Sequence, residues 1–185
     1  MAASDEELML RYAGGDAAAF ETLYASHKGA LFRFVLRSLK SRGEAEELFQ
    51  DVWLRVIEAR ARYAPQAKFT TWLYTIAHHR LVDHWRAKGL ALVSIDDEEK
   101  AVGEVAADPG SEPARVVEAS QTLDRLTAAL AALPFAQREA FLLHHEGGLA
   151  IAQIAAATGS AEEAAKSRLR YAMNRLREAI DDDGT

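Results

Sequence analysis

The stretch KFTTWLYTIAHHRLVDHWRAK, Lys68–Lys88, has the period of an α-helix. At about 100° per residue, one side of this helix gathers apolar residues, as a core-facing stripe should. That stripe consists of Leu73, Tyr74, Ala77, Leu81 and Trp85. A second stripe is polar but includes a tryptophan, and it consists of Trp72, Thr75, His79, Asp83 and Arg86. Such a tryptophan is typical of a half-covered rim position or of a surface that stacks on a ligand, and this helix alone favours the rim.

Helical periods extend over most of the 185-residue chain, whereas the alternation typical of strands is almost absent. Glycine- and proline-containing breaks separate the expected helices, which cover residues 4–13, 16–39, 44–62, 68–88, 119–133, 135–144, 149–157 and 160–180. Residues 89–115, between the fourth and fifth expected helices, are rich in Gly, Pro, Ser and acidic residues, which is typical of a solvated spacer. We therefore predict an all-α fold of two small helical domains, residues 1–88 and 119–185, joined by an acidic flexible linker, residues 89–118.

The formal net charge is −6, but the acidity is unevenly distributed. Residues 89–119 carry two basic and eight acidic residues, so the net charge does not exclude nucleic-acid binding by the rest of the chain. The chain contains no cysteine, and its acidic N-terminus does not resemble a secretory signal. No apolar stretch is long enough to span a membrane. These features predict a cytoplasmic, soluble protein that is not inserted in a membrane.

The C-terminal part has the pattern of a helix-turn-helix. A short helix, Leu149–Ala157, is followed by the turn Thr158–Ser160 and by a capping-box pattern, Ser160 with Glu163, that starts a longer helix. The longer helix is expected to bury Ala165, Leu169, Ala172, Leu176 and Ala179. Its other side is expected to expose Lys166, Ser167, Arg168, Arg170, Tyr171, Asn174, Arg175 and Arg177. Basic surface helices are often only solvated, but turn, cap and basic face together favour DNA binding.

The segment Glu44–Arg60 combines an apolar stripe with an acidic one. The expected buried residues are Ala45, Leu48, Phe49, Val52 and Val56. The opposite side carries Glu44, Glu47, Asp51 and Arg55, with Glu46 and Gln50 beside them. Such a face can be merely solvated, and it also suits a partner helix of opposite charge.

Four blocks carry a resemblance to a known family, and they occur in the family's order: GEAEELFQDVWLRV, KFTTWLYTIAHHRLVDHWR, LPFAQREAFLLHHEGGLAIAQIA and AAKSRLRYAMNRLRE. The chain resembles alternative bacterial sigma factors of the extracytoplasmic-function group, in the sigma-70 family, over about residues 16–88 and 119–180. The resemblance implies two helical domains, core RNA polymerase and promoter DNA as partners, and an anti-sigma factor that holds the protein inactive. It also implies that the linker passes through the polymerase, where its acidic run Asp96–Glu99 would mimic nucleic acid.

The resemblance assigns three sets of residues. The helix that follows Arg42-Gly43 is the main polymerase contact of the family, which points to Glu44, Glu47, Gln50, Asp51 and Arg55. In this group, a base flipped from the non-template strand near minus ten is caught by the loop before the opening helix and by that helix. This role corresponds to Lys68, Phe69, Thr70, Trp72, Thr75, His79, Arg80 and Arg86, although the sequence does not decide which rings stack and which are buried. The minus-thirty-five element would be bound by Lys166, Ser167, Arg168, Arg170, Tyr171, Asn174 and Arg175.

The sequence departs from the family pattern in two places, at His79 and at the start of the recognition helix. His79 stands where family members often have Asn, so the preferred base can differ. Glu163 adds a negative charge at the start of the recognition helix, and Ala164 lacks a hydroxyl that could contact phosphate. Both departures bear on promoter specificity.

Other functional classes receive less support from the sequence. The neighbouring histidines His78, His79 and His84, or His144 and His145, lack the His–His spacing of a metal site on one helix face. The paired glycines are too short for a phosphate-binding loop, and no catalytic motif is present, so we expect neither a cofactor nor an enzyme. The remaining alternative is a helix-turn-helix regulator with an N-terminal sensing domain for a small ligand. Such a regulator would need neither the acidic stripe nor the Trp72 stripe.

Overall fold

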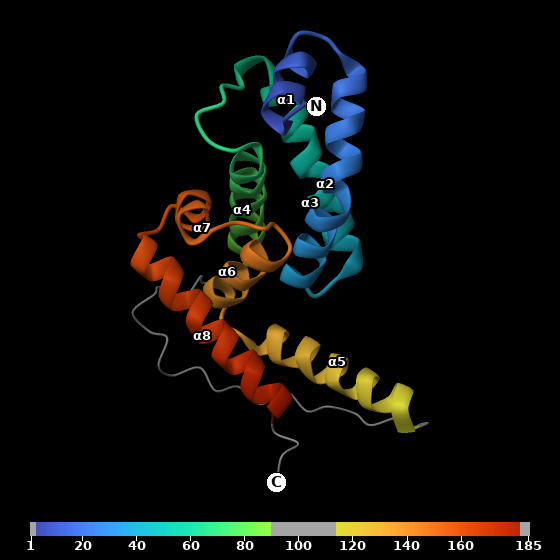
Figure 1. Ribbon diagram of the computed structural model, residues 1–185, viewed down its shortest axis with the longest axis vertical. Coiled ribbons are helices and arrows are strands. Elements are labelled where there is room, and N and C mark those ends of the chain that lie inside the picture. Colours follow the sequence, from blue (N-terminus) through green and yellow to red (C-terminus); the bar gives the residue numbers. More distant parts are fainter. Residues whose placement is uncertain (1–2, 90–113, 182–185) are drawn as a thin grey trace.

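The computed structural model describes residues 3–89 and 114–181, and all regular structure in these ranges is helical (Figure 1). The predicted all-α class is therefore confirmed. The helices are α1 (Asp5–Ala13), α2 (Ala17–Ser38), α3 (Arg42–Ala59), a short 3-10 helix (Arg60–Arg62), α4 (Phe69–Ala87), α5 (Ala114–Ala132), α6 (Phe135–His145), α7 (Ile151–Thr158) and α8 (Glu162–Asp181). The acidic run Asp96–Glu99 lies outside the described residues.

Several helix boundaries differ from the prediction, most clearly at the starts of α3 and α5. Helix α3 begins at Arg42 and includes Gly43, because the Ser41 hydroxyl caps the helix by accepting a hydrogen bond from the Glu44 amide. Helix α5 begins at Ala114, inside the segment predicted to be linker.

Local capping explains how the first two helices start. Ser4 and Glu7 form a capping box at α1, with the Ser4 N–H donating to Glu7 Oε2 at 2.8 Å. Asp16 accepts a hydrogen bond from the Ala19 N–H at the start of α2, and its carboxylate also pairs with Arg11. The Arg11 guanidinium and the Ala19 amide hold the pKa of Asp16 below its ordinary value.

Helices α1 to α4 enclose the core of the first half. The predicted apolar stripe of α4 is confirmed, since Leu73, Tyr74, Ala77 and Leu81 are buried, while Trp85 is half-buried. The buried residues of α4 pack with buried residues of α1, α2 and α3, among them Met9, Leu23, Leu31, Phe34, Val52 and Trp53. Each fully buried large side chain contributes about 1.5–3 kcal/mol, so this packing fixes the faces of α3 and α4 that remain outside.

The second half packs directly on the first. In Figure 1, α7 lies beside α4, and α6 lies between α8 and the lower part of α4. Helix α6 also contacts α2, and the buried apolar residues of both halves form one continuous cluster. Gly147 belongs to this contact, because a Cβ atom there would lie 2.7 Å from the Leu143 carbonyl oxygen and 3.0 Å from Tyr74 Cε2.

Candidate protein and nucleic-acid interfaces

The outer face of α3 contains most of the residues predicted to bind the polymerase. Glu47, Gln50 and Arg55 are exposed, while Glu44 and Asp51 are half-buried. The structure adds Leu54, whose side chain is 55% exposed in the middle of this face. Leu54 was not predicted because the charged residues alone defined this face, although its place four residues after Gln50 puts it on the same side of the helix.

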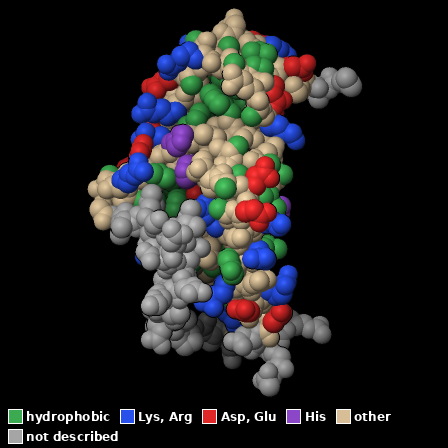
Figure 2. All heavy atoms as spheres, turned by 90° about the vertical axis from the view of Figure 1, so that its left-hand side faces the viewer, with side chains coloured by type: hydrophobic (Ala, Val, Ile, Leu, Met, Phe, Trp, Pro, Cys, Tyr) green, Lys and Arg blue, Asp and Glu red, His purple; other side chains and the backbone are tan. Residues whose placement is uncertain are grey.

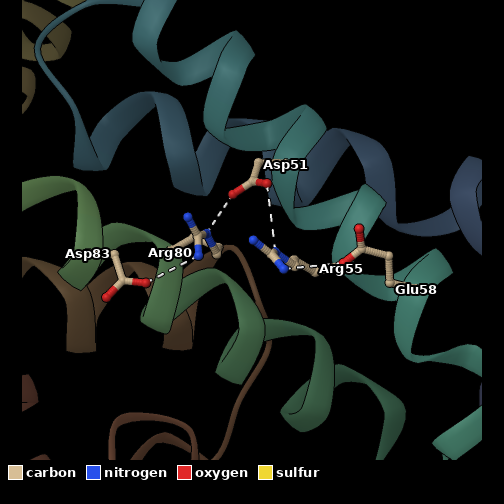
Figure 3. A network of polar contacts seen from close by, with 5 residues as sticks. All are labelled: Asp51, Arg55, Glu58, Arg80 and Asp83. Carbon is tan, nitrogen blue, oxygen red and sulfur yellow. Dashed lines mark hydrogen bonds and ion pairs between the residues drawn. The ribbon is translucent and has the colours of Figure 1, made fainter.

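An ion-pair network connects this face of α3 to α4 (Figure 3). The Asp51 carboxylate lies 2.5 Å from Arg80 Nε and 3.8 Å from Arg55 Nε. Arg80 also contacts Asp83 at 3.2 Å, and Arg55 contacts Glu58 at 3.2 Å. A residue predicted to bind the polymerase, Asp51, is thus paired with a residue predicted to bind DNA, Arg80.

Glu44 forms a second connection between the two helices. Its carboxylate pairs with Lys88 and lies 3.5 Å from His84 Nε2, both at the C-terminal end of α4. The hydrogen bond from Lys88 holds the pKa of Glu44 below its ordinary value. Glu44 is therefore a negatively charged anchor for the end of α4.

The aromatic residues at the start of α4 divide into a buried ring and a half-covered one. Phe69 is fully buried, so it is a core residue and its ring is not available to stack on a base. Trp72 is half-buried, and its ring contacts the edge of Tyr63 at a centroid distance of 4.9 Å and also packs near Phe69. Burial raises the pKa of Tyr63 to about 12. The rim position suggested for Trp72 by α4 alone matches this geometry.

A shallow hollow lies between the loop before α4 and the start of α1. Its lining includes Asp5, Glu6, Gln66, Lys68 and Thr70. The Glu6 carboxylate accepts a hydrogen bond from the Phe69 N–H at 2.6 Å, and this bond holds the pKa of Glu6 below its ordinary value. The hollow therefore contains anionic oxygens next to the Lys68 amine.

The polar stripe of α4 continues from this hollow. His79 and Arg86 are exposed, and the Thr75 hydroxyl donates to the Thr71 carbonyl oxygen at 2.7 Å. Figure 2 shows that the face of the molecule seen there mixes Lys and Arg with acidic side chains, with histidine near its middle. This face offers separate cationic and hydrogen-bonding groups instead of a uniform basic surface.

The predicted helix-turn-helix is present as α7, a turn and α8. Gly159 ends α7 with φ of 65°, the left-handed conformation expected at this turn. The predicted capping box differs, because α8 begins at Glu162 and the Ser160 hydroxyl contacts Thr158 Oγ1 at 3.0 Å. On the outer face of α8, Lys166, Arg170, Tyr171, Asn174 and Arg175 are exposed, and Ser167 is half-buried.

Arg168 does not belong to the exposed face on which the sequence analysis placed it. It is only 7% exposed, because it lies one turn from both Ala165 and Ala172 and points with them towards the core. Its residue type suggested a surface position, whereas the helical period placed it beside the buried stripe. We therefore assign Arg168 to the packing of α8.

The histidines considered for a metal site have other contacts. His78 Nδ1 lies 2.6 Å from Glu139 Oε1, and His144 Nδ1 lies 2.9 Å from the Leu149 carbonyl oxygen. In residues 3–89 and 114–181, His, Cys, Asp and Glu side chains form no group of three or more that could hold a metal ion. The described helices include none long and apolar enough to cross a membrane.

Comparisons with known sequences match both halves of the chain. Residues 23–90 match the family described as Sigma-70 region 2, and residues 123–176 match Sigma-70, region 4. ECF RNA polymerase sigma factor SigK of Mycobacterium tuberculosis (strain ATCC 25618 / H37Rv) is 30% identical over 178 residues, which cover 95% of this chain and 93% of the relative. The chain belongs to the extracytoplasmic-function sigma factors.

Further relatives agree with this assignment. ECF sigma factor SigF of Caulobacter vibrioides (strain NA1000 / CB15N) is 32% identical over 94% of this sigma factor and 92% of the relative. Among solved structures, sigma factor RpoE in complex with the anti-sigma factor NepR from Bartonella quintana has a TM-score of 0.66 and 26% identity, covering 89% of this chain and 98% of that chain. CnrH in complex with the cytosolic domain of CnrY shares the fold, with a TM-score of 0.69 and 22% identity over 97% and 99% of the two chains.

Proposed function

We propose that this sigma factor binds core RNA polymerase and directs promoter-specific initiation, with residues 1–88 contacting the polymerase and melting the minus-ten region and residues 119–185 reading the minus-thirty-five element. The observation that carries the proposal is the presence of both sigma-70 regions, in order, within one match over nearly the whole chain. A helix-turn-helix regulator with a sensing domain would need only the second of them, so the sigma-factor function is favoured.

The outer face of α3 supports the polymerase contact. Leu54 provides an exposed apolar side chain, and Glu47, Gln50 and Arg55 provide a polar and charged rim around it. Protein interfaces commonly combine an apolar centre with a polar rim, and the rim charges orient the partner. The net acidic character of α3 favours a basic partner surface.

The start of α4 supports the minus-ten contact. Trp72 is the candidate stacking ring, because it retains partial exposure while Tyr63 and Phe69 support it from below. His79 and Arg86 are exposed along the same stripe, where they can bond a base edge or a phosphate. Phe69 has the different role of fixing the loop, with its N–H bound to Glu6.

The exposed face of α8 supports the minus-thirty-five contact. Arg170 and Asn174 lie one turn apart, and these side chains bond guanine and adenine edges respectively in the major groove. Lys166 lies one turn before Arg170 on the same side of the helix, where it can reach the phosphate backbone, and Arg175 is exposed on another side of α8. The cost of Glu163 near the DNA is reduced by Lys166, whose amine lies 3.8 Å from it.

An anti-sigma factor is the proposed regulatory partner. The similar sigma factor RpoE of Bartonella quintana has been solved with an anti-sigma factor, NepR, bound to it. The protein would act by binding, without catalysing a reaction of its own, in the cytoplasm where polymerase and promoters are found.

Reconstitution tests this function. The purified chain is mixed with bacterial core RNA polymerase, separated by size and assayed on a promoter library. Co-elution with new promoter-specific transcripts is the expected result. Failure to co-elute, together with sequence-specific duplex binding by the chain alone, would support the regulator instead.

A further inference from the structure

We infer that Glu163, in the first turn of α8, is a specificity-determining residue that selects a cytosine in the minus-thirty-five element. The inference rests on the proposed function and deepens it, because it names a base that this sigma factor reads in its promoter. The Glu163 carboxylate adds an acceptor to a face of α8 on which the other proposed base readers are Arg170 and Asn174.

Glu163 lies on the face of α8 that carries these base readers. At about 100° per residue, Ser167, Arg170 and Asn174 all lie within about 40° of Glu163 around the helix axis. The buried Ala172 lies about 180° round the axis from Glu163, so the Glu163 side chain points directly away from the core. The N-terminal residues of a recognition helix contact base edges in the major groove, so Glu163 stands at the leading end of this face.

The Glu163 carboxylate is available to accept a hydrogen bond from a base. Its side chain is 85% exposed, and its Oε1 lies 3.8 Å from Lys166 Nζ, which is longer than a hydrogen bond. The Lys166 amine therefore reduces the repulsion between this carboxylate and nearby phosphates without occupying the carboxylate oxygens.

Cytosine is the base whose major-groove edge matches a carboxylate. A carboxylate only accepts hydrogen bonds, whereas guanine presents the acceptors N7 and O6 and thymine presents the acceptor O4. Adenine has an N6 donor, but its N7 acceptor lies beside that donor. Cytosine presents the N4 donor alone, so Glu163 favours cytosine over the other three bases. Glu163 precedes Arg170 by about 10.5 Å along the axis, so this cytosine should lie within about three base pairs of the base that Arg170 reads.

An acidic residue in the first turn also stabilises a helix through the helix dipole, and Glu162 shares that property with Glu163. Glu162 lies about 100° from Glu163 round the axis, away from the face that contains Arg170 and Asn174. Glu162→Gln therefore removes the same charge from the same turn, and it is the matched control for Glu163→Gln.

Transcription by the full chain bound to core polymerase tests the inference. The templates derive from one active promoter and carry each of the four bases at every position of the minus-thirty-five element. The wild type is expected to prefer cytosine about tenfold at one position. Glu163→Ala should lose that preference, and Glu163→Gln should shift it to adenine, because an amide bonds both N6 and N7 of that base. Glu162→Gln should keep the preference for cytosine.

A shift to adenine separates base reading from loss of structure, because a destabilised α8 would weaken transcription from all templates alike. The inference is overturned if Glu163→Gln keeps the wild-type preference at every position, weakens all templates alike, or changes the preference no more than Glu162→Gln does. If the wild type gives no promoter-specific transcripts, the proposed function fails, and selection of the same duplexes by the chain alone decides whether Glu163 prefers cytosine.

Discussion

Glu6 illustrates at the residue scale how one carboxylate positions the loop before α4. It accepts the Phe69 N–H, and this bond holds its pKa below the ordinary 4.5. We expect Glu6→Ala to lower the free energy of unfolding at pH 7 by about 1–3 kcal/mol, because the Phe69 N–H loses its acceptor. Urea unfolding monitored by circular dichroism measures this change.

The pH dependence of the same variant has a definite sign. Because the folded-state pKa of Glu6 lies below the unfolded value, its ionised form stabilises the fold above pH 4.5. That contribution is lost as the pH falls through the folded pKa, so the difference between wild type and Glu6→Ala should shrink below pH 4.5. Glu6→Gln keeps an oxygen acceptor but cannot titrate, and a Gln variant as unstable as the Ala variant at pH 7 would contradict this explanation.

Leu54 is an exposed apolar side chain on the face of α3 that is proposed to contact the polymerase. We expect Leu54→Asp to weaken binding to core polymerase about tenfold or more, since it places a charge at the centre of the proposed contact. Its effect on unfolding should stay within about 0.5 kcal/mol, because the side chain is mostly in solvent. Size-exclusion titration against polymerase measures the affinity. Leu10→Asp on α1, where Leu10 is 45% exposed, is the control, and an equal loss in both variants would argue against a specific contact.

At the scale of the element, α8 is expected to separate base reading from phosphate binding. Arg170→Ala and Asn174→Ala should each cost about 1–3 kcal/mol of discrimination between minus-thirty-five sequences. Lys166→Ala should instead weaken all sequences alike and reduce the salt dependence of binding. Transcription from promoters that differ only at minus thirty-five, measured at two salt concentrations, distinguishes the two effects. Lys40→Ala, outside α8, should change neither, and equal behaviour of Arg170 and Lys166 variants would refute base reading by Arg170.

At the scale of the whole molecule, Gly147 sets how closely the halves approach. An added Cβ would meet the Leu143 carbonyl oxygen at 2.7 Å and the Tyr74 ring at 3.0 Å, so Gly147→Ala should cost about 1–3 kcal/mol of stability. Thermal unfolding measures the change. Gly43→Ala is the matched control, because the nearest atom to its Cβ would be Ser41 Oγ at 3.8 Å. Equal melting temperatures for both variants would show that the contact at Gly147 can relax.

The apolar period was sufficient to predict the fold class and the buried stripe of α4, because both depend on neighbours within one helix. It failed where a long side chain stands beside the stripe, as for Arg168, and it did not decide the burial of Phe69, which depends on contacts with distant residues. The pairing of Glu146 with Arg33 joins residues from different halves of the chain, and no local pattern predicts it. The residues assigned to polymerase and DNA binding stay predictions. The structure narrows these sets, because the buried side chains Phe69 and Arg168 cannot contact a partner directly.

The bridge between Asp51 and Arg80 gives the two proposed interfaces a thermodynamic linkage. A polymerase cation that bonds Asp51 competes with Arg80, and the released guanidinium becomes available to a DNA phosphate. The linkage is reciprocal, so DNA that captures Arg80 must strengthen the hold of the polymerase on Asp51 by the same factor. Removing the bridge with Arg80→Ala should abolish this cooperativity. The variant should then bind polymerase with the same affinity with and without promoter DNA strands. Because each partner releases the residue that the other one binds, this sigma factor would favour the ternary complex over either binary one.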